Sequence, residues 1–172
     1  MNNVVLYEPE IPQNTGNIMR TCVASNTTLH LIEPLGFSLD EKEIKRSGAN
    51  YIKDCNYIIY KNWEDFWEKN KDKGSFYFLT RYGHHTMYDV DVKDINKNYY
   101  FILGKESTGI PKELLLEHLD ECIRLPMSDK VRALNVSNVA AIMVYEALRQ
   151  QGFVGLEFEE PENFKGKHYL EK

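Results

Sequence analysis

The chain has 172 residues and a formal net charge of −5 at neutral pH. This length favours a single domain, and a hydrophobic content of 42% argues against a disordered chain. A net acidic chain argues against bulk electrostatic binding to nucleic acid, but it leaves room for a local basic patch.

The three cysteines are an odd number without paired spacing. They indicate reduced thiols in a cytoplasmic protein rather than a zinc site or a disulfide framework. The first residues lack the basic and apolar regions of a signal peptide, so we expect none. No apolar run approaches the ~20 residues of a membrane span, so we expect no membrane contact.

The first predicted strand is Val4–Tyr7, followed by two closely spaced prolines that interrupt regular structure. A helix is predicted over Ile18–Ala24, with Asn14 as its N-cap. Arg20 would then lie near the first turn, where a cation opposes the helix macrodipole. This placement suggests either a functional role for Arg20 or a carboxylate partner such as Glu8 or Glu10.

The remaining apolar runs alternate with helical patterns, which predicts an α/β fold with a mainly parallel sheet flanked by helices. Further strands are expected at Thr28–Ile32, Ile58–Tyr60, Phe76–Leu79, Tyr99–Leu103 and Cys122–Leu125. Earlier helices are expected at Leu39–Arg46, from Trp63 to near Gly74, and around Glu113–Glu117 with Pro111 in its first turn.

The last helix has the clearest periodicity in the chain. Its apolar residues recur at helical spacing and form one wide stripe: Val136, Val139, Ala140, Met143, Val144, Ala147 and Leu148. Asn135 is the predicted N-cap and Gly152 the predicted residue after the C-cap. We therefore expect one domain over residues 1–152 and a polar tail over 153–172.

Leu103–Pro111 links a predicted buried strand to a helix through a loop bracketed by Gly104 and Gly109. Ligands of open α/β sheets bind at such carboxyl ends of strands. Glu106 in this loop is either a functional carboxylate or an ordinary surface residue of a strand-to-helix turn.

Two other polar clusters follow predicted strands, at Asn14–Arg20 and at Leu125–Asn138. A shared ligand site at the carboxyl edge of the sheet would bring all three together. Motifs for a Rossmann dinucleotide site, a P-loop and a nucleophile elbow are absent from the sequence. His84 and His85 are adjacent without an acidic or cysteine partner at ligand spacing, so no metal site is predicted.

Five motifs in order resemble the SPOUT methyltransferases. The similarity is greatest to the minimal, TrmL-type tRNA (cytidine/uridine-34)-2′-O-methyltransferases, and it extends to about Gly152. The motifs are Tyr7–Arg20, Leu31–Gly36, Arg46–Gly48, Leu103–Pro111, and Ile123–Met127 with Leu134–Asn138.

This resemblance implies an α/β fold with a deep C-terminal trefoil knot, an obligate homodimer, and S-adenosyl-L-methionine as cofactor. It implies that backbone groups hold the cofactor, with close approach at the glycines. The implied cofactor-binding residues are Leu79, Thr80, Gly104, Glu106, Leu125, Met127, Ala133 and Leu134. Relatives often carry Ser at position 133, so a side-chain contact there is not expected in this chain.

The implied activity is transfer of a methyl group to the ribose 2′-hydroxyl at the wobble position of tRNA. The resemblance assigns Arg20 as the catalytic residue that activates this hydroxyl, with Asn14 and Asn135 orienting Arg20 and the ribose. A guanidinium stays protonated in proteins, so Arg20 would bind a phosphate and the developing alkoxide. Glu106 would anchor the loop or the cofactor amine, and simple N-capping is the alternative role for both asparagines.

The expected partner is a tRNA anticodon stem-loop, bound weakly and in a salt-sensitive manner by local basic residues. These are Lys42, Lys45, Arg46, Arg81, Lys105, Lys130, Arg132 and Arg149. Two alternatives stay open: 2′-O-methylation of another tRNA or rRNA nucleotide, and a non-catalytic RNA-binding homologue.

Overall fold

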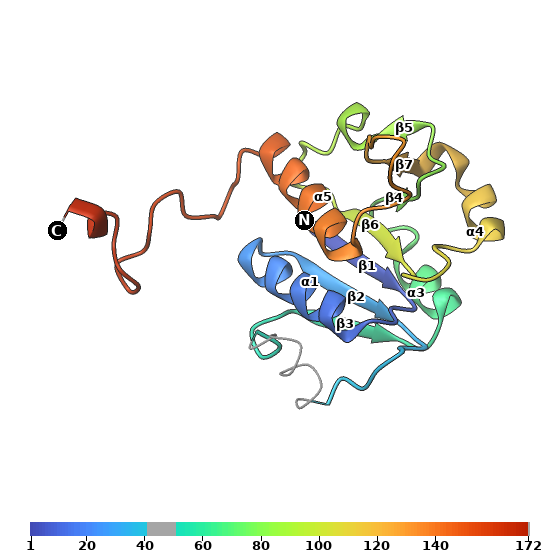
Figure 1. Ribbon diagram of the computed structural model, residues 1–172, viewed down its shortest axis with the longest axis horizontal. Coiled ribbons are helices and arrows are strands. Elements are labelled where there is room, and N and C mark those ends of the chain that lie inside the picture. The colour runs from blue at the N-terminus through green and yellow to red at the C-terminus, as the bar shows by residue number, and fades with distance from the viewer. Residues whose placement is uncertain (41–50, 172) are drawn as a thin grey trace.

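The structure is a computed structural model that describes residues 1–40 and 51–171. Its centre is a seven-stranded sheet with the order β3-β2-β1-β6-β4-β7-β5, and every pair of neighbouring strands is parallel (Figure 1). The predicted α/β fold with a mainly parallel sheet is confirmed. All these strands therefore end at the same edge of the sheet.

The strands agree with the predicted runs to within two residues at either end. They are β1 (Asn2–Tyr7), β2 (Thr28–Ile32), β3 (Tyr57–Tyr60), β4 (Ser75–Leu79), β5 (His85–Thr86), β6 (Tyr99–Gly104) and β7 (Cys122–Arg124). Only β5 had no counterpart in the sequence prediction, because a two-residue strand is too short to produce an alternating pattern.

The α-helices are α1 (Pro12–Ala24), α3 (Trp63–Asn70), α4 (Lys112–Glu117) and α5 (Val136–Gln150). Short 3₁₀ helices in the described residues cover Met87–Asp89, Leu119–Glu121 and Tyr169–Glu171. The predicted helix Leu39–Arg46, with Lys42 and Lys45, lies largely outside the described residues, as does the Arg46–Gly48 motif.

Alternate side chains of β1, β2, β4, β6 and β7 enter two hydrophobic cores on opposite faces of the sheet, as the pleat requires. In β1, Val4 and Leu6 join the core under α1 and α5, whereas Val5 joins the core on the opposite face. The second core is rich in aromatic residues and includes Phe66 of α3. Helices therefore cover both faces of the sheet, which is typical of parallel sheets.

Helix α5 confirms its predicted apolar stripe and both of its predicted ends. Its buried residues are Ser137, Ala140, Met143, Val144, Ala147 and Leu148. The Asn135 side chain accepts a hydrogen bond from the Ser137 N–H at 2.9 Å, so Asn135 is the N-cap. Gly152 follows the C-cap with φ of +71°, in the left-handed region that glycine adopts without strain.

Helix α1 begins six residues earlier than predicted. Pro12 occupies its first turn, where a fixed φ suits the helix and a missing N–H costs nothing. The N-cap is Ile11, so the prediction that Asn14 caps this helix is wrong. Arg20 consequently lies two turns into the helix rather than near its first turn, and the expected conflict with the helix dipole disappears.

Residues after α5 leave the domain gradually. Asn26 donates a hydrogen bond from Nδ2 to the Gly155 carbonyl oxygen at 3.1 Å, and Phe153 and Leu156 pack against the core below α5. Beyond them the chain extends away from the sheet (Figure 1). Within the described residues, no helix is both long enough and apolar enough to cross a membrane.

Candidate active site at the carboxyl ends of the central strands

The predicted cofactor-binding residues lie at the ends of three neighbouring strands. Leu79 ends β4 and Thr80 follows it, Gly104 ends β6, and Leu125 follows β7 directly. In the sheet β4 lies between β6 and β7, so these strand ends form one continuous edge. Ligands of parallel α/β sheets bind at this edge.

Hydrogen bonds between side chains join the three polar clusters, which are Asn14–Arg20, the Glu106 loop and Leu125–Asn138. Asn14 donates from Nδ2 to Glu106 Oε1 at 3.2 Å, and its Oδ1 accepts from Asn135 Nδ2 at 2.9 Å. Asn14 is only 6% exposed, so these bonds are shielded from water. These two hydrogen bonds therefore link α1 to the loop after β6 and to the N-terminus of α5.

Glu106 acts as an anchor for the backbone that enters α1. Its Oε2 accepts from the Glu10 N–H at 2.9 Å, and its Oε1 accepts from the Ile11 N–H at 3.2 Å. A carboxylate near the first turn also complements the helix dipole. Both oxygens are engaged by the protein itself, which supports the anchoring role predicted for Glu106.

Two further contacts connect the segment before α1 to the loop after β6. Glu10 accepts hydrogen bonds from the Ser107 N–H and hydroxyl, both at 2.9 Å, and these bonds lower the pKa of its carboxyl. Lys105 forms an ion pair with Glu8, and the hydrogen bond that its ammonium group donates to the Glu8 carboxylate raises the pKa of Lys105. Glu8 and Glu10 therefore bind Lys105 and Ser107, and the prediction that one of them is the partner of Arg20 is wrong.

Gly104 and Gly109, the two glycines of this loop, are favoured at their positions for different structural reasons. Gly104 has φ of +112°, and a Cβ there would lie 2.4 Å from the Tyr7 carbonyl oxygen. Gly109 has φ of +74° with open space around it. At Gly104 the close neighbour is thus the end of β1, and the close approach of the cofactor to the glycines stays a prediction.

Arg20 is exposed on α1, and its guanidinium carbon lies 5.3 Å from the centroid of the Tyr51 ring. In the described part of the chain, neither Asn14 nor Asn135 hydrogen-bonds to Arg20. The asparagines therefore hold the loops together, and the expectation that they orient Arg20 finds no contact within this subunit.

Backbone groups suited to a ligand are present in the loop before α5. Across residues 1–40 and 51–171, the backbone N–H and C=O groups of Met127, Ala133 and Leu134 bond to no other backbone group. Ala133 and Leu134 are also exposed. This observation fits cofactor binding through backbone groups, as the family resemblance implies. Ala133 can bind the cofactor in this way without a side-chain hydroxyl.

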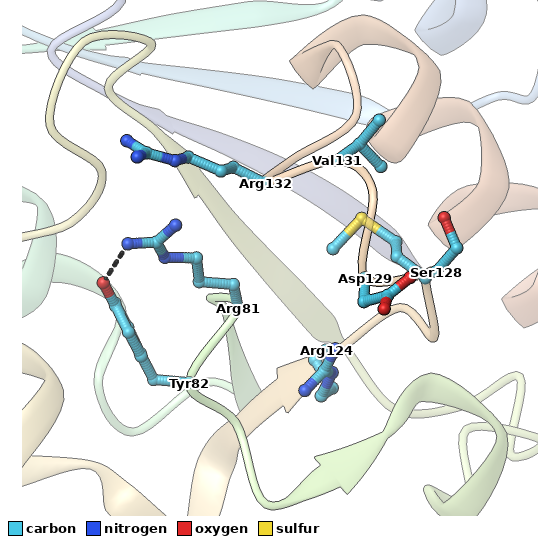
Figure 2. A pocket seen from close by; sticks show the side chains of 8 residues that line it. Arg81, Tyr82, Arg124, Ser128, Asp129, Val131 and Arg132 are labelled. Carbon is cyan, nitrogen blue, oxygen red and sulfur yellow. Dashed lines mark hydrogen bonds between the residues drawn. The ribbon is translucent and has the colours of Figure 1, made fainter.

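A pocket of about 400 Å³ opens beside these residues (Figure 2). Met127 is the only predicted cofactor residue in its lining. Arg81 and Arg132 were predicted as RNA-binding residues, whereas Tyr82 and Arg124 were not identified. Tyr82 lies in the loop after β4 and Arg124 at the end of β7, and these positions are the signal that could have revealed them. In the part of the chain that the structure describes, no group of three or more His, Cys, Asp or Glu residues could hold a metal ion.

Comparison with known proteins places the chain in a family. The model of the SpoU rRNA Methylase family matches residues 1–145. A protein from Listeria innocua, named as a candidate tRNA (cytidine(34)-2′-O)-methyltransferase, is 53% identical over 155 residues, which cover 90% of this chain and 91% of that protein. The resemblance to methyltransferases found in the sequence is thereby confirmed.

Solved structures agree with this similarity. A candidate RNA methyltransferase from Bacillus anthracis is 51% identical, has a TM-score of 0.89, and covers 93% of this chain and 100% of its own. A structure described in connection with 2-OH methylation of C/U34 on tRNA is 34% identical, with a TM-score of 0.81 and coverage of 88% and 97%. The chain belongs to the SpoU rRNA Methylase family.

Proposed function

We propose that this protein transfers a methyl group from S-adenosyl-L-methionine to the ribose 2′-hydroxyl of nucleotide 34, a cytidine or uridine, in tRNA. The observation that carries this proposal is similarity over nearly the whole length of both chains to a candidate tRNA (cytidine(34)-2′-O)-methyltransferase. The structural similarity at 34% identity points to the same nucleotide.

The cofactor is assigned to the edge formed by β6, β4 and β7. Leu79, Thr80 and Gly104 border it at the strand ends, and the loop from Leu125 to Leu134 offers its open backbone groups. When bound there, the cofactor supplies an activated methyl group on a positively charged sulfur. The protein's own task is to position the acceptor hydroxyl, because orientation contributes much of the rate in transfers between two substrates.

Arg20 is assigned to the acceptor hydroxyl. Its guanidinium stays protonated, so it stabilises the developing alkoxide and binds the adjacent phosphate, while phosphate or water takes the proton. Arg20 is exposed and makes no hydrogen bond to Asn14 or Asn135 in the described residues. This position suits action on a cofactor held by a partner subunit.

The proposal includes a homodimer in the cytoplasm, with one knotted domain over residues 1–152 and a tail beyond it. Support for a dimer is the apolar surface of α5, where Ile142 and Tyr145 are exposed. Support for the knot is the path of the chain after β7. It returns from near one edge of the sheet so that Asn135 contacts Asn14 beside β1.

The test uses tRNA isolated from cells that lack wobble methylation. The protein is incubated with this tRNA and radioactive S-adenosylmethionine, and the labelled nucleotide is then mapped. Label at nucleotide 34 is expected, and label only elsewhere would reassign the substrate. Titration calorimetry with the cofactor is run in parallel, because the absence of cofactor binding would leave a non-catalytic RNA-binding protein instead of an enzyme.

A further inference from the structure

The pocket of Figure 2 has an unusual charge distribution for a chain with a net charge of −5. Three arginines line it, Arg81 after β4, Arg124 at the end of β7, and Arg132 in the loop before α5. Asp129 is the only acidic residue in the lining. The pocket therefore attracts anions although the protein as a whole repels them.

The charges of the three guanidinium groups are not neutralised by carboxylates of the described residues. Within residues 1–40 and 51–171, no ion pair joins Arg81, Arg124 or Arg132 to a carboxylate. In Figure 2 the side chains of Arg81 and Arg132 extend in the same direction, whereas Arg124 lies on another side of the pocket. Guanidinium groups presented in this way match the geometry of phosphate oxygens.

An exposed aromatic ring lies beside this cluster. Tyr82 is 65% exposed, and Arg81 donates a hydrogen bond to its hydroxyl at 2.6 Å. The Arg81 guanidinium carbon also lies 4.8 Å from the ring centroid. A single-stranded nucleic acid is held by this combination, with cations on its phosphates and aromatic rings under its bases.

The pocket also borders the proposed cofactor site along the chain. Arg81 directly follows Thr80, and Arg132 directly precedes Ala133. Met127 belongs both to the pocket lining and to the predicted cofactor residues. A nucleotide held in the pocket would therefore place its neighbour close to the transferred methyl group.

We infer that Arg81, Arg132 and Tyr82 form a clamp for the nucleotide next to the methylated one. The two arginines bind backbone phosphate, and the Tyr82 ring stacks on the neighbouring unpaired base. Arg124 adds positive charge from the side of β7. This inference rests on the proposed function for the identity of the RNA, but it concerns RNA binding and is measurable without any methyl transfer.

The test measures binding of a synthetic anticodon stem-loop RNA, unmethylated at nucleotide 34, over a range of salt concentrations. Arg81→Ala and Arg132→Ala are each expected to reduce the slope of log affinity against log salt by about 0.7, the contribution of one phosphate contact in single-stranded RNA. Tyr82→Ala is expected to weaken binding on the order of ten-fold, whereas Tyr82→Phe keeps the ring and most of the affinity.

Lys93→Ala is the matched control for charge. Lys93 is exposed, pairs with Asp91, and lies before β6, at the edge of the sheet opposite to the site. This variant loses one positive charge, as the arginine variants do, but should leave the salt slope unchanged. Circular dichroism of each variant confirms that the fold is intact.

The outcomes separate the clamp from the proposed function. Unchanged salt slopes and affinities in the arginine and Tyr82→Ala variants would overturn the clamp, as would a wild-type protein that binds no RNA. Loss of S-adenosylmethionine affinity with RNA binding intact would also overturn it, since the arginines would then hold the carboxylate of the cofactor. Normal RNA binding without methylation by the wild type would contradict the proposed function alone.

Discussion

Asn135 donates a hydrogen bond from Nδ2 to Oδ1 of Asn14 at 2.9 Å, across 121 positions of the chain. Asn14 in turn donates to Glu106, so one buried amide links the starts of α1 and α5 to the loop after β6. These three segments surround the proposed cofactor site. Their relative position depends on a few directed bonds rather than on packing alone.

Replacing Asn14 with alanine should therefore loosen the site. The variant loses two hydrogen bonds and leaves Asn135 Nδ2 without its partner, which we expect to lower the free energy of unfolding by about 1–3 kcal/mol. Urea denaturation measures this loss, and calorimetry should show weaker S-adenosylmethionine binding. Asn56→Ala removes one exposed hydrogen bond, to Thr28, and serves as control with a much smaller effect. Equal stability of the two variants would contradict the role of Asn14.

Glu106→Gln tests the anchor with little change in shape. A glutamine has one acceptor oxygen, so its amide group would face an N–H of Glu10 or Ile11 that the carboxylate now satisfies. We expect a loss of about 1–3 kcal/mol in the free energy of unfolding. Faster amide exchange at Glu10 and Ile11 should accompany it. Unchanged exchange at these two amides would show that the carboxylate does not hold the entry to α1.

The glycines of the same loop provide a matched pair of substitutions. Both have positive φ, but only at Gly104 would a Cβ meet a neighbouring atom, the Tyr7 carbonyl oxygen at 2.4 Å. Gly109→Ala should cost about 1–2 kcal/mol, the penalty of the left-handed conformation alone. Gly104→Ala should cost clearly more, because the ends of β1 and β6 must separate. Urea denaturation would contradict this reasoning if it gave equal losses for the two variants.

A buried histidine predicts how stability depends on pH. His30 lies in the aromatic core, where Nε2 bonds to Asn3 Oδ1 at 3.0 Å and Nδ1 to the Tyr60 hydroxyl at 2.9 Å. Since an amide oxygen only accepts, Nε2 carries the proton and Nδ1 accepts from Tyr60. Burial lowers the pKa of His30 from 6.5 to about 4.

The unfolded chain therefore binds a proton at this histidine between pH 6.5 and 4, while the folded protein does not. Stability is fully present above pH 6.5 and falls as the pH drops, by up to about 3 kcal/mol near pH 4. Urea denaturation at pH 7 and 4.5 measures the loss. In His30→Gln the difference between the two pH values should shrink, whereas His85→Gln, at an exposed histidine, should retain it.

Arg20→Ala should abolish methyl transfer and leave S-adenosylmethionine affinity unchanged, because Arg20 is assigned to the acceptor and not to the cofactor. Its contact with the Tyr51 ring is exposed and contributes at most about 1 kcal/mol, so the fold should persist. Arg20→Lys keeps the charge but loses the planar fork, and intermediate activity is expected. Wild-type turnover in the alanine variant would remove Arg20 from the mechanism.

The sequence predicted those features that depend on neighbouring residues. The apolar stripe of α5, its cap at Asn135 and the strand β6 all follow from local periodicity and short-range hydrogen bonding. The start of α1 could not be predicted from neighbouring residues, because part of its stabilisation comes from Glu106, more than ninety positions away.

The features of the proposed site also differ in whether local sequence could predict them. The strand ends that carry Thr80, Gly104 and Leu125 were predicted individually, but their adjacency follows from the strand order, which no local pattern encodes. The N-cap role predicted for Asn14 and the pairing of Glu8 with Arg20 were wrong for this reason, since the partners of both residues lie in other segments. Motif resemblance identified the chemistry where local physical patterns did not.

Methylation of the ribose at nucleotide 34 is tested most directly with tRNA that lacks wobble methylation. This tRNA is incubated with the wild-type protein and S-adenosylmethionine, and 2′-O-methylation at each nucleotide is then measured by mass spectrometry. The proposed function predicts stoichiometric 2′-O-methylcytidine or 2′-O-methyluridine at position 34, and none with Arg20→Ala. An unmodified position 34 after incubation with a wild-type protein that binds both the cofactor and the tRNA would contradict it.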